Sequence, residues 1–243
     1  MRAVITAGGT VEERFADAIG TPIKALARVG TRALLDAAID ACTGAGIERI
    51  AVVGGDEVKA HLAGRAVRVI DAAADGATNV LRALDAWPEE RFLYLTSDLP
   101  FVQAPGLSDF IARSEPFALT MALCASLAYD ARFPGSPPNG LTLRGERIVN
   151  GCAFVLDPSA VAPARALATR FFDARKSLFA LARLLGPALC LRFATKRLAV
   201  TDIERYASRV LGVPVAAIRG SDPGLCYDID TLAEYEYGCT RLA

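Results

Sequence analysis

Two adjacent glycines follow a short apolar segment at the start of the chain, in Thr6-Ala7-Gly8-Gly9-Thr10. At the carboxyl end of a strand, glycines let backbone N–H groups approach a phosphate without an intervening side chain. Open parallel sheets bind ligands at this edge. The pattern is neither a G-x-G-x-x-G fingerprint nor a Walker A loop, so a tight loop that uses glycine for its backbone freedom is the alternative.

Two cationic side chains follow this loop. Lys24 lies among apolar neighbours before a predicted helix and can reach back over the glycines as a point charge for a polyphosphate. Arg14 can act in the same way, although the adjacent Glu12 and Glu13 offer it ordinary surface partners. A solvated surface charge is the alternative for both residues.

Asp98 ends the clearest predicted strand, within Thr96-Ser97-Asp98-Leu99-Pro100-Phe101. A carboxylate at this position can hold a Mg²⁺ ion between the protein and substrate phosphates. Pro100 restricts Leu99 to extended geometry, which leaves the carboxylate presented. A helix N-cap is the alternative, because aspartate is a favoured cap residue.

A second acidic pair lies near the end of the chain, in Asp228-Ile229-Asp230-Thr231. In an extended segment the two aspartates project to the same face, so this stretch can offer two carboxylates to a metal. Thr231 and Glu234 have the spacing of a capping box that starts a helix. Both interpretations can hold, because a cap fixes the turn that directs Asp230.

Three further residues have weaker signals. Lys176, on a predicted helix, can stabilise charge on an attacked phosphate or be a surface charge. Asn150-Gly151 can shape an acceptor pocket or form a hairpin turn. His61 is the single histidine, which argues against a Ser-His-Asp or Cys-His site and excludes a multi-histidine metal site.

Strand and helix patterns alternate through the first half of the chain, apart from a loop expected from Gly8 to about Gly30. Such alternation predicts a doubly wound, mostly parallel α/β sheet with helices on both faces. In the second half we expect helices over 158–185 and a strand–helix–strand segment over 187–220 that begins with a strand at 189–191. The predicted strands of the first half are 3–5, 50–53, 67–70, 92–95 and 119–124, and its helices are 34–45 and 78–84.

The composition excludes several classes of protein. The 243 residues include 27 basic and 27 acidic side chains, and 53% are hydrophobic, which excludes a disordered chain and argues against an extended nucleic-acid surface. No uncharged apolar run reaches the roughly 18 residues of a membrane span, and no secretory signal is evident. The six cysteines lack C-x-x-C spacing. We expect a cytoplasmic protein with small-molecule substrates and neither nucleic-acid nor membrane partners.

Taken in order, residues 4–9, 24–26, 95–101 and 228–231 resemble the NTP transferase superfamily. The resemblance is to molybdenum-cofactor guanylyltransferase and methylerythritol-phosphate cytidylyltransferase. It covers the first half of the chain and its last residues. It implies a glycosyltransferase-A-like Rossmann fold in one domain, 1–243, with residues 165–220 as an added helical subdomain.

The resemblance also implies roles for individual residues. Ala7-Gly8-Gly9-Thr10 matches the nucleotide-binding loop, and Lys24 matches the lysine that contacts the triphosphate. Asp98 and Asp230 match the metal ligands. Relatives have a second glycine and an Arg-Met pair after the loop, for which Arg14 is the candidate equivalent here. Gly76, Thr78 and Asn79 fall where relatives contact the base or ribose.

The sequence therefore predicts a Mg²⁺-dependent nucleotidyltransferase that transfers NMP from an NTP to a small, phosphorylated acceptor and releases pyrophosphate. Asp98 and Asp230 would hold the metal, while Lys24, Lys176 and the loop amides would compensate phosphate charge. Two alternatives remain. One is a glycosyltransferase-A-type sugar transferase with Asp228-x-Asp230 as its metal motif, and the other is a nucleotide-binding regulatory protein without turnover. The base, the acceptor and the oligomeric state are not identified.

Overall fold

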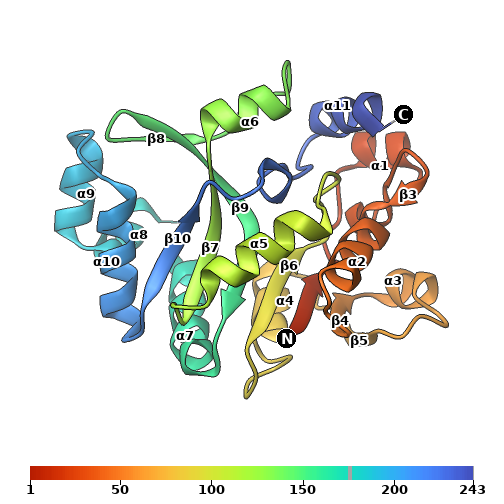
Figure 1. Cartoon of the computed structure of the whole chain (residues 1–243), viewed down its shortest axis with the longest axis horizontal. Helices are drawn as coiled ribbons and strands as arrows, with labels where there is room; N and C mark the ends of the chain where they lie inside the picture. Colours follow the sequence, from red (N-terminus) through yellow and green to blue (C-terminus); the bar gives the residue numbers. More distant parts are fainter. Residues whose placement is uncertain (175–176, 243) are drawn as a thin grey trace.

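The computed structural model describes residues 1–174 and 177–242, which form an eight-stranded sheet flanked by helices (Figure 1). The strand order is β10-β7-β9-β6-β1-β4-β5, and β8 pairs with β9. β1, β4, β5 and β6 run parallel to one another, β10 is parallel to β7, and β9 is antiparallel to both β6 and β7. The strands are β1 (Arg2–Thr6), β4 (Arg49–Gly54), β5 (Arg68–Asp71), β6 (Phe92–Thr96), β7 (Leu119–Ala125), β8 (Leu141–Leu143), β9 (Glu146–Leu156) and β10 (Val215–Arg219). This confirms the predicted doubly wound, mostly parallel α/β fold.

Apolar strands at the centre of the sheet place side chains in two separate cores. Successive side chains of a strand point to opposite faces, so Ile5 and Val4 of β1 lie in different clusters. Ile5 packs in the core that includes residues of α2 (Leu34–Gly44) and α5 (Ala104–Ser114). Val4 packs in the core that includes residues of α4 (Gly76–Leu84) and α7 (Pro158–Ala174). Both faces of the sheet are therefore covered, as continuous apolar strands require.

The remaining elements lie around the rim and at one end of the molecule. In Figure 1, α8, α9 and α10 stand together at the far left, and α1 and α11 lie side by side at the upper right. A two-stranded ribbon pairs β2 with β3. These elements are α1 (Glu13–Ile19), η1 (Lys24–Leu26), β2 (Arg28–Val29), β3 (Arg32–Ala33), α3 (Asp56–His61), α6 (Ser126–Arg132), α8 (Leu178–Leu185), α9 (Pro187–Ala194), α10 (Val200–Leu211), η2 (Pro223–Leu225) and α11 (Leu232–Leu242).

Three local expectations are wrong. Asn150-Gly151 is not a hairpin turn but lies within the long strand β9, and the turn falls at Arg144 and Gly145, both at positive φ. A Cβ on Gly151 would lie 2.7 Å from the Cβ of Ala122 and 2.8 Å from the carbonyl oxygen of Leu225, so this glycine permits close strand packing.

The other two wrong expectations concern short segments. Residues 189–191 belong to helix α9, which begins with Pro187 directly after Gly186, a favoured order at a helix start. The expected loop from Gly8 to Gly30 contains α1, which buries Phe15 against the ring of Tyr235. Among the described residues, no helix combines the length and apolarity that a membrane span requires.

Candidate active site

The glycine loop and Asp98 lie at one edge of the sheet because their two strands run side by side. β1 and β6 pair in parallel with Thr6 opposite Thr96, so the segments that follow both strands emerge together. The Ser97 amide donates to the Thr6 carbonyl at 3.1 Å, and the Ala7 amide donates to the Val53 carbonyl at 2.8 Å. These bonds extend the sheet by one residue and fix the start of each loop.

The C-terminal acidic segment is tied to Asp98 through the backbone. The Ile229 amide donates to the Asp98 carbonyl at 3.0 Å. The predicted capping box is confirmed, since the amides of Asp230 and Thr231 donate to Glu234 Oε2 at 2.8 and 2.7 Å. Asp230 is thus held on an ordered turn, although its side chain is 67% exposed.

Lys24 joins the two aspartates. Its backbone amide donates to the Gly9 carbonyl at 3.0 Å, which places it beside the glycine loop. Its Nζ lies 2.5 Å from Asp98 Oδ2 and 2.7 Å from Asp230 Oδ1. Burial alone would lower the pKa of Lys24, but the charges and hydrogen bonds of the two carboxylates outweigh it and raise that pKa above its usual range. Lys24 is therefore a permanent cation at this site.

The site still holds more negative than positive charge. Burial, followed by the charges of Asp98 and Asp230, raises the pKa of Asp228 to about 6. Above that pH, the three carboxylates outnumber the ammonium of Lys24, which is the cation that pairs with them in the described part of the chain. Asp98 Oδ1 is buried and has no hydrogen-bond partner among the described residues. An unpaired carboxylate oxygen in an acidic cluster is a position that a cation can fill.

A cavity of about 220 Å³ opens directly beside these charges. A Cβ on Gly9 would meet only Lys24 Cε, at 3.9 Å, so the Gly9 backbone borders open space. A Cβ on Gly8 would lie 2.7 Å from Asn79 Nδ2, so this glycine is required by packing. The lining residues are Thr6, Gly8, Gly9, Lys24, Gly76, Asn79, Val80, Thr96, Ser97 and Asp98.

The other residues predicted for nucleotide binding lie at different distances from the cavity. Asn79 lines the cavity. Its side-chain Oδ1 accepts from the Ala73 backbone amide at 2.7 Å and its Nδ2 donates to the Ala73 carbonyl at 3.1 Å, so Asn79 also holds the neighbouring loop in place. Thr78 lies in the first turn of α4, where its amide donates to Asp75. It is not among the lining residues.

Four more predicted residues are absent from the lining of the cavity: Ala7, which is buried, Asp230, which contacts Lys24, and Thr10 and Arg14. Thr10 is exposed and bridges to Ile23 through the backbone. Arg14 is exposed on α1 and does not line the cavity. Lys176 lies outside the described residues.

Sequence reasoning missed two threonines that line the cavity, Thr6 and Thr96. Each ends an apolar run that forms a central strand, and this change from apolar to polar at two strand ends is the signal that could have found them. Thr6 Oγ1 lies 3.1 Å from the hydroxyl of Tyr94. Both side chains lie on the face of the sheet that α4 covers.

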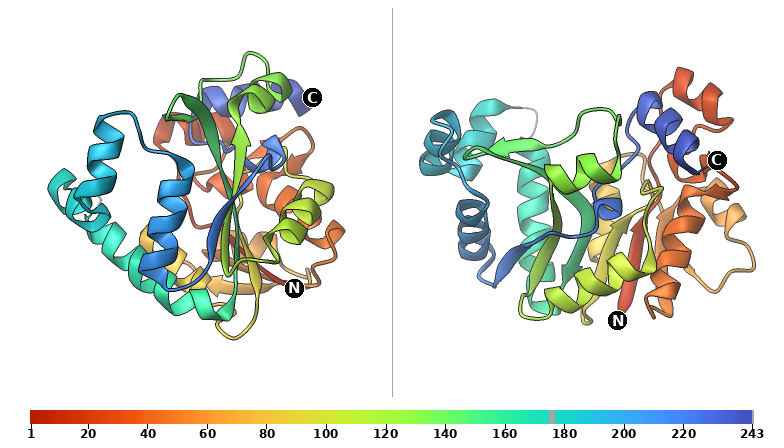
Figure 2. Two further views of the ribbon diagram at one scale, coloured as in Figure 1. Left: turned by 60° about the vertical axis from the view of Figure 1, so that its left-hand side comes forward. Right: turned by 45° about the horizontal axis from the view of Figure 1, so that its top comes forward.

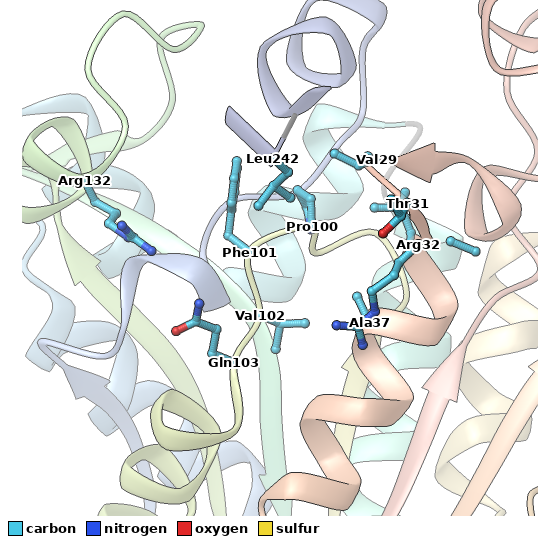
Figure 3. Close-up of a pocket in the computed structure, with 12 residues that line it drawn as sticks. Val29, Thr31, Arg32, Ala37, Pro100, Phe101, Val102, Gln103, Arg132 and Leu242 are labelled. Carbon is cyan, nitrogen blue, oxygen red and sulfur yellow. The ribbon is translucent and has the colours of Figure 1, made fainter. Parts of the chain in front are cut away.

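A second cavity, of about 240 Å³, lies on the outer side of the loop that follows Asp98 (Figure 3). Arg32 and Arg132 stand on opposite sides of Phe101 there. No residue predicted for catalysis or nucleotide binding is among its lining residues. Those of the predicted site residues that line either of these two cavities therefore line the one beside Lys24.

Comparisons with known proteins bear on the fold and the family of the chain. No curated protein matches the chain. A hypothetical transferase from Thermus thermophilus is 27% identical with a TM-score of 0.82, over 96% of this chain and 98% of that one.

Two enzymes with named substrates share the fold at lower identity. The 2-C-methyl-D-erythritol 4-phosphate cytidylyltransferase of Thermus thermophilus is 16% identical with a TM-score of 0.57, over 99% of this chain and 98% of that one. The CMP:2-keto-3-deoxy-manno-octonic acid synthetase solved with CTP is 10% identical with a TM-score of 0.59, over 99% of this chain and 97% of that one.

The family model of the MobA-like NTP transferase domain matches residues 3–183, which is most of the chain and includes the glycine loop, Lys24 and Asp98. This match confirms the resemblance predicted from the sequence. The chain belongs to the MobA-like NTP transferase family and is a nucleotidyltransferase.

Proposed function

We propose that this nucleotidyltransferase uses Mg²⁺ to transfer NMP from an NTP to a small phosphorylated acceptor, with release of pyrophosphate. The supporting observation is the convergence of Lys24, Asp98 and Asp230, which come from three distant parts of the chain, in one ion-paired cluster. Lys24 and Asp98 of this cluster line the cavity. Their charges suit a substrate that brings both phosphate oxygens and a cation.

The residues present fit a magnesium ion held jointly with substrate. In the described part of the chain, no three acidic, histidine or cysteine side chains form a metal site by themselves. Mg²⁺ usually takes one or two carboxylates and completes its shell with water and substrate phosphates. Asp98, through its unpartnered Oδ1, and Asp230 are the carboxylates that would hold it. When bound, the ion would neutralise charge on the phosphate oxygens.

The reaction itself requires positioning and charge compensation. An oxygen of the acceptor phosphate forms a new bond to the α-phosphorus of the NTP, the α–β bridging P–O bond breaks, and its electron pair leaves with pyrophosphate. Lys24 would turn from the two aspartates toward the phosphates and compensate charge on the leaving group. The Gly9 backbone lets the triphosphate approach, because no side chain stands between it and the cavity.

Two measurements test the proposal. In a thermal-shift screen of the four NTPs with Mg²⁺, one NTP should raise the melting temperature more than the other three. A ligand that binds only the folded state stabilises that state. Pyrophosphate release should then depend on Mg²⁺, and Asp98→Asn should lower it by about two to three orders of magnitude.

Asp17→Asn is the matched control, since Asp17 is exposed on α1 and does not line the cavity. Unchanged turnover in Asp98→Asn would contradict the assigned role of Asp98. Release of a nucleoside diphosphate from a sugar nucleotide would indicate the sugar transferase instead. Tight NTP binding without any product would indicate the regulatory protein.

A further inference from the structure

A groove of about 250 Å³ lies between α10 and the end of the sheet formed by β7, β8, β9 and β10. In Figure 2, left, the blue helix α10 stands beside these strands and α8 and α9 lie further out. Phe154 of β9 lines this groove and pairs across the sheet with Tyr94 of β6. Side chains of paired residues share a face, and Thr96 lies two residues along β6 from Tyr94. The groove and the nucleotide cavity therefore open on the same face.

Cys152 lies between residues of the groove and of the cavity, although it lines neither of them. It lies on β9 between Asn150 and Phe154, which both line the groove. Because Ala153 pairs with Leu95, Cys152 lies next to Thr96, which lines the cavity. Burial raises the pKa of the Cys152 thiol, and the charges of nearby aspartates, including Asp98, raise it further. Because residues two apart on a strand are separated by roughly 7 Å, Cys152 is about that far along β9 from the groove residues Asn150 and Phe154.

The chemistry of the groove differs from that of the cavity. Its lining consists mainly of apolar side chains, such as Met121, Phe154 and Ile203. Glu204 is the only charged residue among the described residues that line it, and its Oε1 accepts from the Ala217 amide at 2.9 Å. No described lysine or arginine lines the groove, so an anionic group there would lack a counter-ion.

We propose that this groove binds the hydrocarbon body of the acceptor, so that the acceptor is an alkyl, prenyl or aryl phosphate with no second anionic group. The inference rests on the proposed function, because it is the phosphate end of such a molecule that reaches Lys24 and Asp98. The apolar end lies along β7 and β9 under α10. Affinity for the acceptor then comes from apolar surface removed from water.

A series of probes of increasing length tests this inference. The affinities of n-butyl, n-hexyl and n-octyl phosphate are measured by calorimetry on the full chain, without nucleotide and with the NTP selected by the thermal screen. Each added CH₂ group that is buried should tighten binding by about threefold to fourfold. Glycerol 3-phosphate, which has the same charged end and a polar body, should bind more weakly than the hexyl and octyl compounds.

Two variants of α10 distinguish binding in the groove from nonspecific binding to apolar surface elsewhere. Ile203 is 40% exposed and lines the groove, whereas Val210 is 38% exposed on the same helix and does not. Because both sites are on the surface of a helix, replacement by glutamine should leave the fold intact. Ile203→Gln should weaken binding of octyl phosphate by about threefold or more, whereas Val210→Gln should not. Both variants should keep the NTP-induced thermal shift of the original chain.

The outcomes are distinguishable from those of the proposed function. Equal affinity for glycerol 3-phosphate and octyl phosphate, or a chain-length dependence that Ile203→Gln leaves unchanged, would overturn the inference even if every NTP measurement succeeds. A dimer of the original chain that Ile203→Gln dissociates would also overturn it, because a second copy would then cover the groove. If no NTP binds, the proposed function fails, while the nucleotide-free titrations still decide whether the groove takes a hydrocarbon chain.

Discussion

Replacing Lys24 by methionine should destabilise the protein in the absence of metal. The Lys24 and Asp98 side chains are only 17% and 12% exposed, so the variant leaves the Asp98 carboxylate buried without its cation. Loss of one partner of a buried ion pair costs about 3–5 kcal/mol. The contact with Asp230, which is 67% exposed, adds at most about 1 kcal/mol. We therefore expect a loss of about 3 kcal/mol, because methionine retains most of the lysine's apolar packing.

Urea unfolding in EDTA at neutral pH measures this loss as a shift of the midpoint at constant slope. Lys59→Met is the matched control, since Lys59 is exposed on α3 and should change the free energy of unfolding by less than about 0.5 kcal/mol. Adding Asp98→Asn to Lys24→Met should recover part of the loss, because the unpaired charge is then removed.

The same variant tests the proposed metal. In the original chain the Lys24 ammonium contacts one oxygen of each carboxylate that would hold Mg²⁺ and repels the cation. A millimolar concentration of Mg²⁺ without nucleotide should therefore stabilise Lys24→Met more than the original chain. Equal Mg²⁺ effects on both proteins would refute the shared use of Asp98 and Asp230. A loss of stability no larger than that of Lys59→Met would refute the account of the ion pair itself.

The glycine loop and Asp228 give two more predictions. Gly8→Ala should lower the melting temperature, because its Cβ would lie 2.7 Å from Asn79 Nδ2. Gly9→Ala should keep the melting temperature of the protein alone but lose part of the shift that NTP induces. The reverse result would contradict the roles assigned to the two glycines. Folding raises the pKa of Asp228 from 3.8 to about 6, so its contribution to stability is greatest below about pH 4 and is lost as the pH rises through 6. In urea unfolding with EDTA, Asp228→Asn should therefore stabilise the protein at pH 8 by about 2 kcal/mol and have little effect at pH 4, whereas a constant effect at both pH values would contradict this origin.

Much of the fold follows from local sequence patterns. The central strands are uninterrupted apolar runs, and in β1 and β6 a threonine marks the end of the run. Where a local pattern is ambiguous, prediction fails. Asn150-Gly151 has the residues of a tight turn, yet close packing against Ala122 places this pair within β9. Similarly, the short apolar run at 189–191 fits a strand or a helix equally well, and Pro187 decides for the helix.

In the candidate site too, some features follow from the local sequence and others depend on distant segments. Residue type and position predicted the glycine loop, Lys24, Asp98 and the capping box that precedes α11, since each depends on neighbours within a few residues. The sequence did not predict that Asp228 is partly buried, or that Arg14 and Thr10 are exposed, because burial depends on segments far away in the chain.

By itself, the sequence determined the central strands of the first half and the polar groups that end them, because those properties arise from local periodicity and from the chemistry of single residues. Only the tertiary structure decided that Lys24 contacts both Asp98 and Asp230, through the parallel pairing of β1 with β6 and the hydrogen bond from Ile229 to Asp98. Likewise, only the packing of α10 against the end of the sheet forms the apolar groove beside the site. Contacts between distant segments depend on the packing of the whole chain, which local patterns do not specify.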